Sequence, residues 1–150
     1  MIFFNKMYSK GFLLLTSIVC VTVAEDKTIA IKVRPQQVLE LRKGAEICAE
    51  KTGVDPGILI KVIDWTFDED EASKAFVYCL SVNTGYVDTN ANVNVTKLLG
   101  HELVRGTQED YIKKLNECAK IKKENKIDTV FEFGNCLYGF LEVIVVKPSS

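Results

Sequence analysis

The 150-residue chain contains few of the groups on which most enzymes depend. It has a single histidine, His101, and neither a G-x-S-x-G nor an H-E-x-x-H motif surrounds that residue. A lone histidine seldom forms a catalytic set without such partners, and no two cysteines have the close spacing of zinc ligands. We therefore expect His101 to be a surface or interface residue, and the protein to be no enzyme and to need no metal or cofactor.

The chain also lacks an excess of charge of one sign. Its 19 Lys and Arg residues nearly balance 20 Asp and Glu residues, for a net charge of −1. Without a basic stripe, nucleic acid is not an expected partner. The ordinary composition excludes a disordered chain, a collagen and a repeat solenoid. What remains is a globular protein that is large enough to bury a core.

A long apolar run is absent as well, except near the start of the chain. Residues 1–24 combine two lysines, Lys6 and Lys10, with the apolar run 12–21 and small residues at the end. This order is typical of a secretory signal peptide, and the run is too short for a membrane span of about 20 apolar residues. We expect cleavage of this peptide, no membrane insertion afterwards, and secretion of a single domain of residues 25–150; an uncleaved amphipathic anchor is the alternative.

Apolar residues recur every three or four positions along most of residues 25–150, which predicts helices. We expect five or six helices in one all-α domain, without a hairpin. A β-branched stretch near the end, residues 143–146, is either extended or helical. The expected helices run from Pro35 to Gly53, from Asp55 through Ile63, from the acidic cluster 68–71 to Gly85, from Val95 towards Leu103, from Thr107 to Ala119, and from Asp128, as the cap, to Phe140.

Four cysteines remain once Cys20 has left with the leader: Cys48, Cys79, Cys118 and Cys136. All four fall on the apolar faces of predicted helices. In a secreted chain an even number of cysteines indicates disulfides rather than free buried thiols. Four cysteines allow three pairings, and the count alone does not choose among them.

Motifs around these cysteines resemble those of the insect odorant-binding proteins. Cys-Ala-Glu-Lys-Thr-Gly-Val at 48–54 and Cys-Leu-Ser-Val-Asn-Thr-Gly-Tyr-Val-Asp at 79–88 carry most of the likeness. Asn-Glu-Cys at 116–118 and Asn-Cys-Leu at 135–137 extend it over essentially the whole mature chain. The resemblance implies a compact bundle of about six helices around an internal hydrophobic cavity, held by two disulfides.

The common form of this family has six cysteines, bridged first to third, second to fifth and fourth to sixth. The positions of the second and fifth are occupied here by Ala75 and Ile127, so the two missing cysteines are a bridged pair. The pattern resembles the four-cysteine, "minus-C" subgroup of the family. The resemblance implies the bridges Cys48–Cys79 and Cys118–Cys136, and more freedom of movement between the helices at Ala75 and Ile127.

A function follows from the resemblance rather than from the residues alone. Family members hold a small apolar ligand, so the expected protein is a secreted carrier of odorants, pheromones or fatty molecules, with an odorant receptor or a second copy of the chain as further candidate partners. The residues expected to line the cavity are Phe76, Leu80, Leu98, Leu103, Tyr111, Leu115, Phe133, Leu137, Tyr138 and Phe140. We expect Tyr111 and Tyr138 to offer hydroxyl contacts, and residues 141–146 to fold back as a lid.

The segment 88–94 places oxygen-bearing side chains at every second residue, as at the start of a calcium loop. Val93 and Leu99 stand where such a loop needs a glycine and a bidentate glutamate. Turn formation explains these Asn and Asp residues better than a cation does. Asn94 begins a glycosylation sequon, Asn-Val-Thr, and is also a good N-cap, and both interpretations stay open.

Three alternatives to an olfactory carrier also stay open. The same kind of carrier could belong to venom, saliva or another gland, and tissue expression would separate these roles. A helical secreted signalling protein would act through its surface and show no saturable uptake of an apolar probe. A lipid-acting enzyme is the weakest alternative, because the residues to carry its chemistry are missing.

Overall fold

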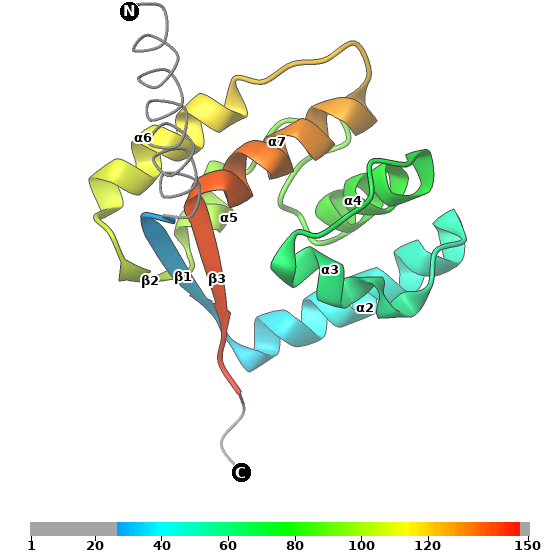
Figure 1. The fold of residues 1–150 in the computed structure, drawn as a ribbon, viewed down its shortest axis with the longest axis horizontal. Coiled ribbons are helices and arrows are strands. Elements are labelled where there is room, and N and C mark those ends of the chain that lie inside the picture. Colours follow the sequence, from blue (N-terminus) through cyan, green and yellow to red (C-terminus); the bar gives the residue numbers. More distant parts are fainter. Residues whose placement is uncertain (1–26, 148–150) are drawn as a thin grey trace, which may run out of the picture.

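The computed structural model describes residues 27–147, and the expected signal peptide with its cleavage site lies outside them. This part of the chain is mostly helical and contains one small sheet (Figure 1). The helices are α2 (Pro35–Thr52), α3 (Leu59–Asp64), α4 (Glu71–Asn83), α5 (Val95–Leu99), α6 (Gln108–Ala119) and α7 (Lys126–Phe140), with a 3₁₀ turn, η1 (Pro56–Ile58), before α3. The strands are β1 (Ile29–Val33), β2 (Glu102–Arg105) and β3 (Leu141–Val145). The predicted helical fold with two disulfides is confirmed.

Helix α2 begins at Pro35 and stops before Gly53, as the sequence predicts. Proline suits the first position of a helix because its missing N–H has no partner to lose there. Gly53 adopts a φ of 77°, the left-handed conformation that commonly ends a helix and that glycine reaches without strain. On the buried face of α2, the disulfide Cys48–Cys79 joins this helix to α4.

Short polar side chains cap the N-termini of helices α4, α5 and α6. The caps are Asp70 for α4, Asn94 for α5 and Thr107 for α6. In each case a side-chain oxygen accepts a hydrogen bond from a backbone N–H of the first turn, which would otherwise lack a partner. The positions of these helix starts could therefore be read from the sequence.

The start of α7 differs from the prediction that Asp128 is its cap. The cap is Asn125, whose Oδ1 accepts a hydrogen bond from the backbone N–H of Asp128 at 2.8 Å. Asp128 instead lies within the first turn and accepts a hydrogen bond from Nδ2 of Asn125 at 2.7 Å. Both residue types cap helices well, but a carboxylate one turn further in also interacts favourably with the positive end of the helix dipole.

The fold also contains a sheet of three strands, which was not predicted from the sequence. Strand β1 lies in the middle, antiparallel to β2 and parallel to β3. Residues 141–145 are thus extended, which was one of the two alternatives for this stretch, and β3 continues directly from α7 (Figure 1). Parallel partners from opposite ends of a chain need no hairpin turn and leave no local sequence signal.

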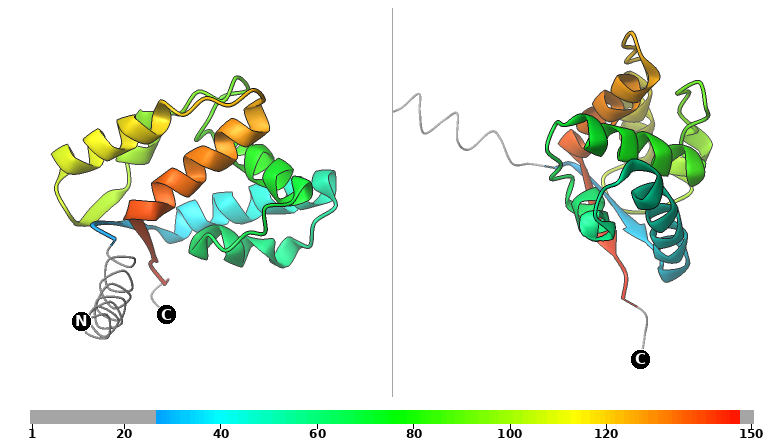
Figure 2. Two further views of the ribbon diagram at one scale, coloured as in Figure 1. Left: turned by 45° about the horizontal axis from the view of Figure 1, so that its top comes forward. Right: turned by 90° about the vertical axis from the view of Figure 1, so that its right-hand side faces the viewer.

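Helix α7 runs through the middle of the molecule, with α6 on one side and α2 and α4 on the other (Figures 1 and 2). A buried cluster lies on each side of it. In one cluster Phe76 of α4 packs with Phe131 of α7, and in the other Tyr111 of α6 packs with Leu137 of α7. The disulfide Cys118–Cys136 joins α6 to α7. Within residues 27–147, no helix has the length and hydrophobicity to cross a membrane.

Candidate binding pocket

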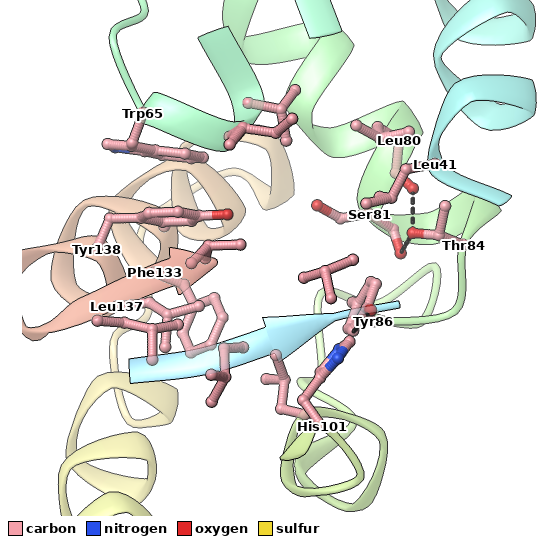
Figure 3. A pocket seen from close by; sticks show the side chains of 18 of the residues that line it. Leu41, Trp65, Leu80, Ser81, Thr84, Tyr86, His101, Phe133, Leu137 and Tyr138 are labelled. Atoms are coloured by element: carbon pink, nitrogen blue, oxygen red, sulfur yellow. Dashed lines mark hydrogen bonds between the residues drawn. The ribbon is translucent and has the colours of Figure 1, made fainter. Parts of the chain in front are cut away.

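A pocket of about 130 Å³ lies where the sheet meets helices α2, α3, α4 and α7 (Figure 3). Most of its walls are aliphatic or aromatic. The described residues that line it are Ile31, Val33, Val38, Leu41, Leu59, Val62, Ile63, Trp65, Leu80, Ser81, Thr84, Tyr86, Val87, Leu98, His101, Val130, Phe133, Gly134, Leu137, Tyr138, Leu141, Val143 and Val145. Segments from both ends of the described chain therefore come together at this one site.

Two parallel strands form one wall of the pocket. Ile31 and Val33 of β1 and Leu141, Val143 and Val145 of β3 all line it. These residues occupy alternate positions, and alternate side chains of a strand point to the same face of a sheet. The register sets Ile31 beside Val143 and Val33 beside Val145, so the two rows of side chains form one continuous apolar surface. Strand β3 is thus part of the pocket wall.

Two stacked aromatic rings form another wall. The indole of Trp65 lies nearly parallel to the ring of Tyr138, with 4.7 Å between centroids and an angle of 9° between planes. Its Nε1 donates a hydrogen bond to Oδ1 of Asn135 at 2.8 Å. A Cβ atom at Gly134 would lie 2.1 Å from the indole, so only glycine lets Trp65 come this close to α7. Trp65 also has a φ of 50°, an uncommon conformation for so bulky a residue.

The other side of the pocket carries a hydrogen-bonded pair, Tyr86 and His101 (Figure 3). The hydroxyl of Tyr86 lies 2.7 Å from Nε2 of His101, and the two rings are stacked. Only 8% of His101 is exposed, so the prediction of a surface histidine is wrong. Its flanking residues, Gly100 and Glu102, are exposed and polar or small, which is why the local sequence does not signal burial.

Burial sets the protonation of this pair. It lowers the pKa of His101, and the cations Lys97 and Arg34 lower that pKa further, against an opposing effect from the backbone of Lys32. Burial also raises the pKa of Tyr86 to about 12. The imidazole is therefore neutral and the phenol protonated near pH 7, and they meet as an uncharged pair. Nδ1 of His101 is buried and has no hydrogen-bond partner among the described residues.

Two hydroxyl groups point into the pocket from opposite sides, that of Tyr138 on α7 and that of Ser81 on α4 (Figure 3). Neither makes a hydrogen bond to another described side chain or backbone group. The third hydroxyl of this region differs, because Oγ1 of Thr84 donates to the carbonyl oxygen of Leu80 at 2.6 Å. Burial raises the pKa of Tyr138, so its hydroxyl keeps its proton at physiological pH.

Charged side chains do not contribute to the pocket wall. Among the described residues that line it, none is Asp, Glu, Lys or Arg. The part of the chain that the structure describes also contains no group of three His, Cys, Asp or Glu residues that could hold a metal ion. The arrangement can hold a small molecule by apolar burial and by hydrogen bonds to hydroxyl groups.

The structure brings together half of the residues that were expected to line a cavity. Leu80, Leu98, Phe133, Leu137 and Tyr138 line the pocket. The other five lie in or against the two buried clusters: Phe76 in the cluster of α4, and Leu103, Tyr111, Leu115 and Phe140 in that of α6. The hydroxyl of Tyr111, expected to contact a ligand, donates at 3.4 Å to the carbonyl oxygen of Leu98.

Several lining residues were not expected from the sequence. Ile31 and Val33 of β1 were missed because the sheet was not predicted, whereas residues 141–146 were expected at the cavity as a lid. Trp65 and Tyr86 were missed because they follow helix ends instead of lying on a periodic apolar face. One signal was available for Trp65, since it is the only tryptophan of the chain and aromatic residues often dominate apolar walls.

The loop between α4 and α5 is held by its own Asn and Asp side chains. Oδ1 of Asp88 accepts hydrogen bonds from the backbone N–H groups of Asn90 and Asn92, at 2.8 and 2.9 Å. This is the turn-forming role that was preferred over calcium binding. Nδ2 of Asn94 donates to the carbonyl oxygen of Gly85 at 3.2 Å while its Oδ1 caps α5. Asn94 is exposed, and glycosylation there stays a prediction.

The comparison with protein families decides what kind of protein carries this pocket. The model of the PBP/GOBP family matches residues 31–139. The chain belongs to the PBP/GOBP family. Strand β3, which supplies part of the pocket wall, lies beyond the matched residues.

Solved structures show the same fold for this PBP/GOBP chain. It is similar to odorant-binding protein dmelOBP28a from Drosophila melanogaster, with 18% identity over 69% of this chain and 91% of that one, and a TM-score of 0.55. It is also similar to Odorant Binding Protein 7 from Anopheles gambiae, with 21% identity over 69% of this chain and 85% of that one, and a TM-score of 0.52. That mosquito structure has four disulfide bridges and holds an azo compound.

The two disulfides of this PBP/GOBP protein fit the four-cysteine, minus-C subgroup of insect odorant-binding proteins. At the positions of the missing cysteines, Ala75 and Ile127 line a second, open groove between α4 and the start of α7. Beside them, Nζ of Lys74 lies 3.3 Å from Oδ1 of Asp128. An ion pair therefore links the two helices where the six-cysteine form has a covalent bridge.

Proposed function

We propose that this PBP/GOBP protein is a secreted carrier that binds small hydrophobic molecules in the pocket behind β1 and β3, keeps them in solution and delivers them, with odorants or pheromones as its cargo. The apolar pocket, in a chain of this family, is the observation that carries the proposal. Burying apolar ligand surface contributes about 0.8 kcal/mol per CH₂ group. A few polar groups then suffice to orient the ligand.

The pocket residues divide into two proposed roles. Leu80, Leu98, Phe133, Leu137 and Tyr138 contact the ligand. The remaining members of the expected set, Phe76, Leu103, Tyr111, Leu115 and Phe140, hold α4, α6 and α7 in place through the two buried clusters. This division is supported by the pocket lining, which includes the first five residues and none of the second five.

Secretion and the lid are proposed on separate grounds. Two disulfides are typical of proteins that fold in an oxidising compartment, which supports removal of residues 1–24 as a signal peptide. Strand β3 has β1 as its only neighbour in the sheet, which supports the tail as the movable side of the pocket. A strand with one partner has fewer hydrogen bonds to break than a central one.

Calorimetric titration of residues 25–150 with 1-hexanol and with toluene tests the proposed function. We expect saturable binding of one molecule per chain. Val62→Phe adds a ring at a lining residue of α3 and should abolish most of this binding. Ile60→Phe adds the same ring to the same helix at a position that is 68% exposed and outside the pocket, and should bind like the unmodified protein.

Two other results would contradict parts of this proposal. Absence of saturable binding would instead favour a signalling protein that acts through its surface. Equal loss in the Val62→Phe and Ile60→Phe proteins would place the binding site elsewhere. The tissue in which the transcript is found separates an olfactory carrier from one of venom or saliva.

A further inference from the structure

The free hydrogen-bonding capacity of the pocket is concentrated in two side chains. The polar groups of its lining that already have a partner are Nε1 of Trp65, Oγ1 of Thr84 and the Tyr86–His101 pair. Nδ1 of His101 also lacks a partner among the described residues, but this atom is buried. Oη of Tyr138 and the hydroxyl of Ser81 remain, and they face each other across the pocket (Figure 3). Since a hydroxyl both donates and accepts, one ligand oxygen between them can use both groups.

The charge of the pocket restricts that oxygen to a neutral group. None of the described lining residues carries a charge. Lys97 lies 4.9 Å from the ring centroid of Tyr86, but it is not a lining residue, and its Nζ donates to the carbonyl oxygen of Thr84. A carboxylate in the pocket would lose its hydration without gaining a cation, which strongly disfavours its burial.

The size of the pocket restricts the apolar part of the ligand. Its volume is about 130 Å³. A cavity of about 150 Å³ in a protein core holds one benzene molecule.

We infer that the pocket selects a neutral molecule of one ring or a short carbon chain that carries a single oxygen, as an alcohol, aldehyde or ketone, held between the hydroxyls of Tyr138 and Ser81. This inference rests on the proposed function and names the ligand class of the same site. It gives Tyr138 and Ser81 the role of specificity-determining residues. Long-chain acids, which belong to the broader range of fatty cargo, are excluded from the class.

Four single compounds test the inference by calorimetry at pH 7.5: benzyl alcohol, toluene, benzoate and 1-naphthalenemethanol. In the unmodified protein, benzoate and 1-naphthalenemethanol should each bind at least about tenfold more weakly than benzyl alcohol, because one is charged and the other has a second ring. Tyr138→Phe and Ser81→Ala should each weaken benzyl alcohol about three- to tenfold and change toluene by less than about twofold. The matched control is Tyr78→Phe, which removes a hydroxyl that donates to the carbonyl oxygen of Thr89 outside the pocket and should change neither affinity.

The outcomes separate this inference from the proposed function. Binding of benzoate or 1-naphthalenemethanol as tight as that of benzyl alcohol would overturn the ligand class while leaving a carrier in place. The same holds if either hydroxyl deletion weakens toluene as much as benzyl alcohol, or weakens neither. Failure of all four compounds to bind would overturn the proposed function itself.

Discussion

The indole of Trp65 lies against α7 at a point where that helix has no side chain. The Cβ of any residue but glycine at position 134 would lie 2.1 Å from the ring, well inside van der Waals contact. The indole fills that space, stacks on Tyr138 and donates to Asn135. One small residue thus decides whether the aromatic wall of the pocket can form.

Gly134→Ala should therefore destabilise the protein even though alanine favours a helix. We expect a loss of about 1–3 kcal/mol in the free energy of unfolding, as for other overpacked cores, and a change in the near-ultraviolet circular dichroism of Trp65. Gly139→Ala, in the same helix with no atom within 4 Å of the new Cβ, should be neutral or stabilising by up to about 1 kcal/mol. Urea unfolding of both variants measures the difference. Equal stabilities would show that Trp65 can move away at no cost.

His101 makes stability depend on pH in a direction that its environment fixes. Burial holds the pKa of this residue below its usual value of 6.5 in the folded state. As the pH falls through about 6.5, His101 takes up a proton in the unfolded chain before it does so in the folded chain. The free energy of unfolding therefore decreases until the pH has passed the pKa of His101 in the folded state. His101→Gln removes this titration, and the difference in unfolding free energy between the unmodified protein and the variant should shrink between pH 8 and pH 5. Parallel pH curves would show that His101 titrates alike in both states.

At the residue scale, the local role of a side chain can be predicted from the sequence better than its surroundings in the folded protein. The caps Asn94 and Thr107 could be recognised because capping depends on neighbours a few positions away, whereas the acidic cluster 68–71 indicated the start of α4 without distinguishing Asp70 as its cap. His101 and Tyr111 could not be placed, because their surroundings come from distant segments. Tyr111 donates to the carbonyl oxygen of Leu98 on another helix, and no local pattern distinguishes such a hydroxyl from one that faces a pocket.

At the scale of elements, helices were predicted and strands were not. Helix periodicity is a property of one segment, whereas β1 acquires its role only when β3 lies beside it. The pairing of Lys32 with Ile144 and of Val33 with Val145 joins the two ends of the described chain. The pairing of β1 with β3 forms one wall of the pocket. The residues expected to line a cavity were chosen from predicted helices, so that set contains no residue of this wall. The β-branched residues of 143–146 were the one local sign of an extended tail.

Deletion of residues 141–150 tests whether β3 contributes to binding. Loss of Leu141, Val143 and Val145 opens the pocket to water, so benzyl alcohol should bind at least about tenfold more weakly. Deletion of residues 147–150 is the control, because it leaves β3 and the hydrogen bond from Val146 N–H to the carbonyl oxygen of Val33 intact. Circular dichroism must show that both shortened chains keep their helices. Unchanged affinity in a folded chain without β3 would contradict the proposed lid.

At the scale of the whole molecule, the two disulfides divide the helices into two pairs. Cys48–Cys79 joins α2 to α4, and Cys118–Cys136 joins α6 to α7. Within the described residues no disulfide joins one pair to the other, and their contacts are non-covalent: packing between α4 and α7, the pairing of β1 with β3, and the ion pair Lys74–Asp128. The pocket is lined by residues of α2 and α4 on one side and of α7 on the other. Movement between the pairs should therefore change the pocket.

The double substitution Ala75→Cys with Ile127→Cys restores a bridge between the two pairs. Both positions line the groove beside Lys74 and Asp128, and the ion pair between these two residues already links α4 to α7. We expect a third disulfide and an unfolding free energy that rises by about 2–4 kcal/mol, because the bridge removes freedom from the unfolded chain. Thiol titration and urea unfolding before and after reduction measure both effects, and each single cysteine variant serves as the control. If both thiols stay free, or if the bridge forms and the free energy of unfolding falls, the prediction is wrong. Either result would show that α4 and α7 are positioned differently here from the six-cysteine form, with the ion pair in place of the bridge.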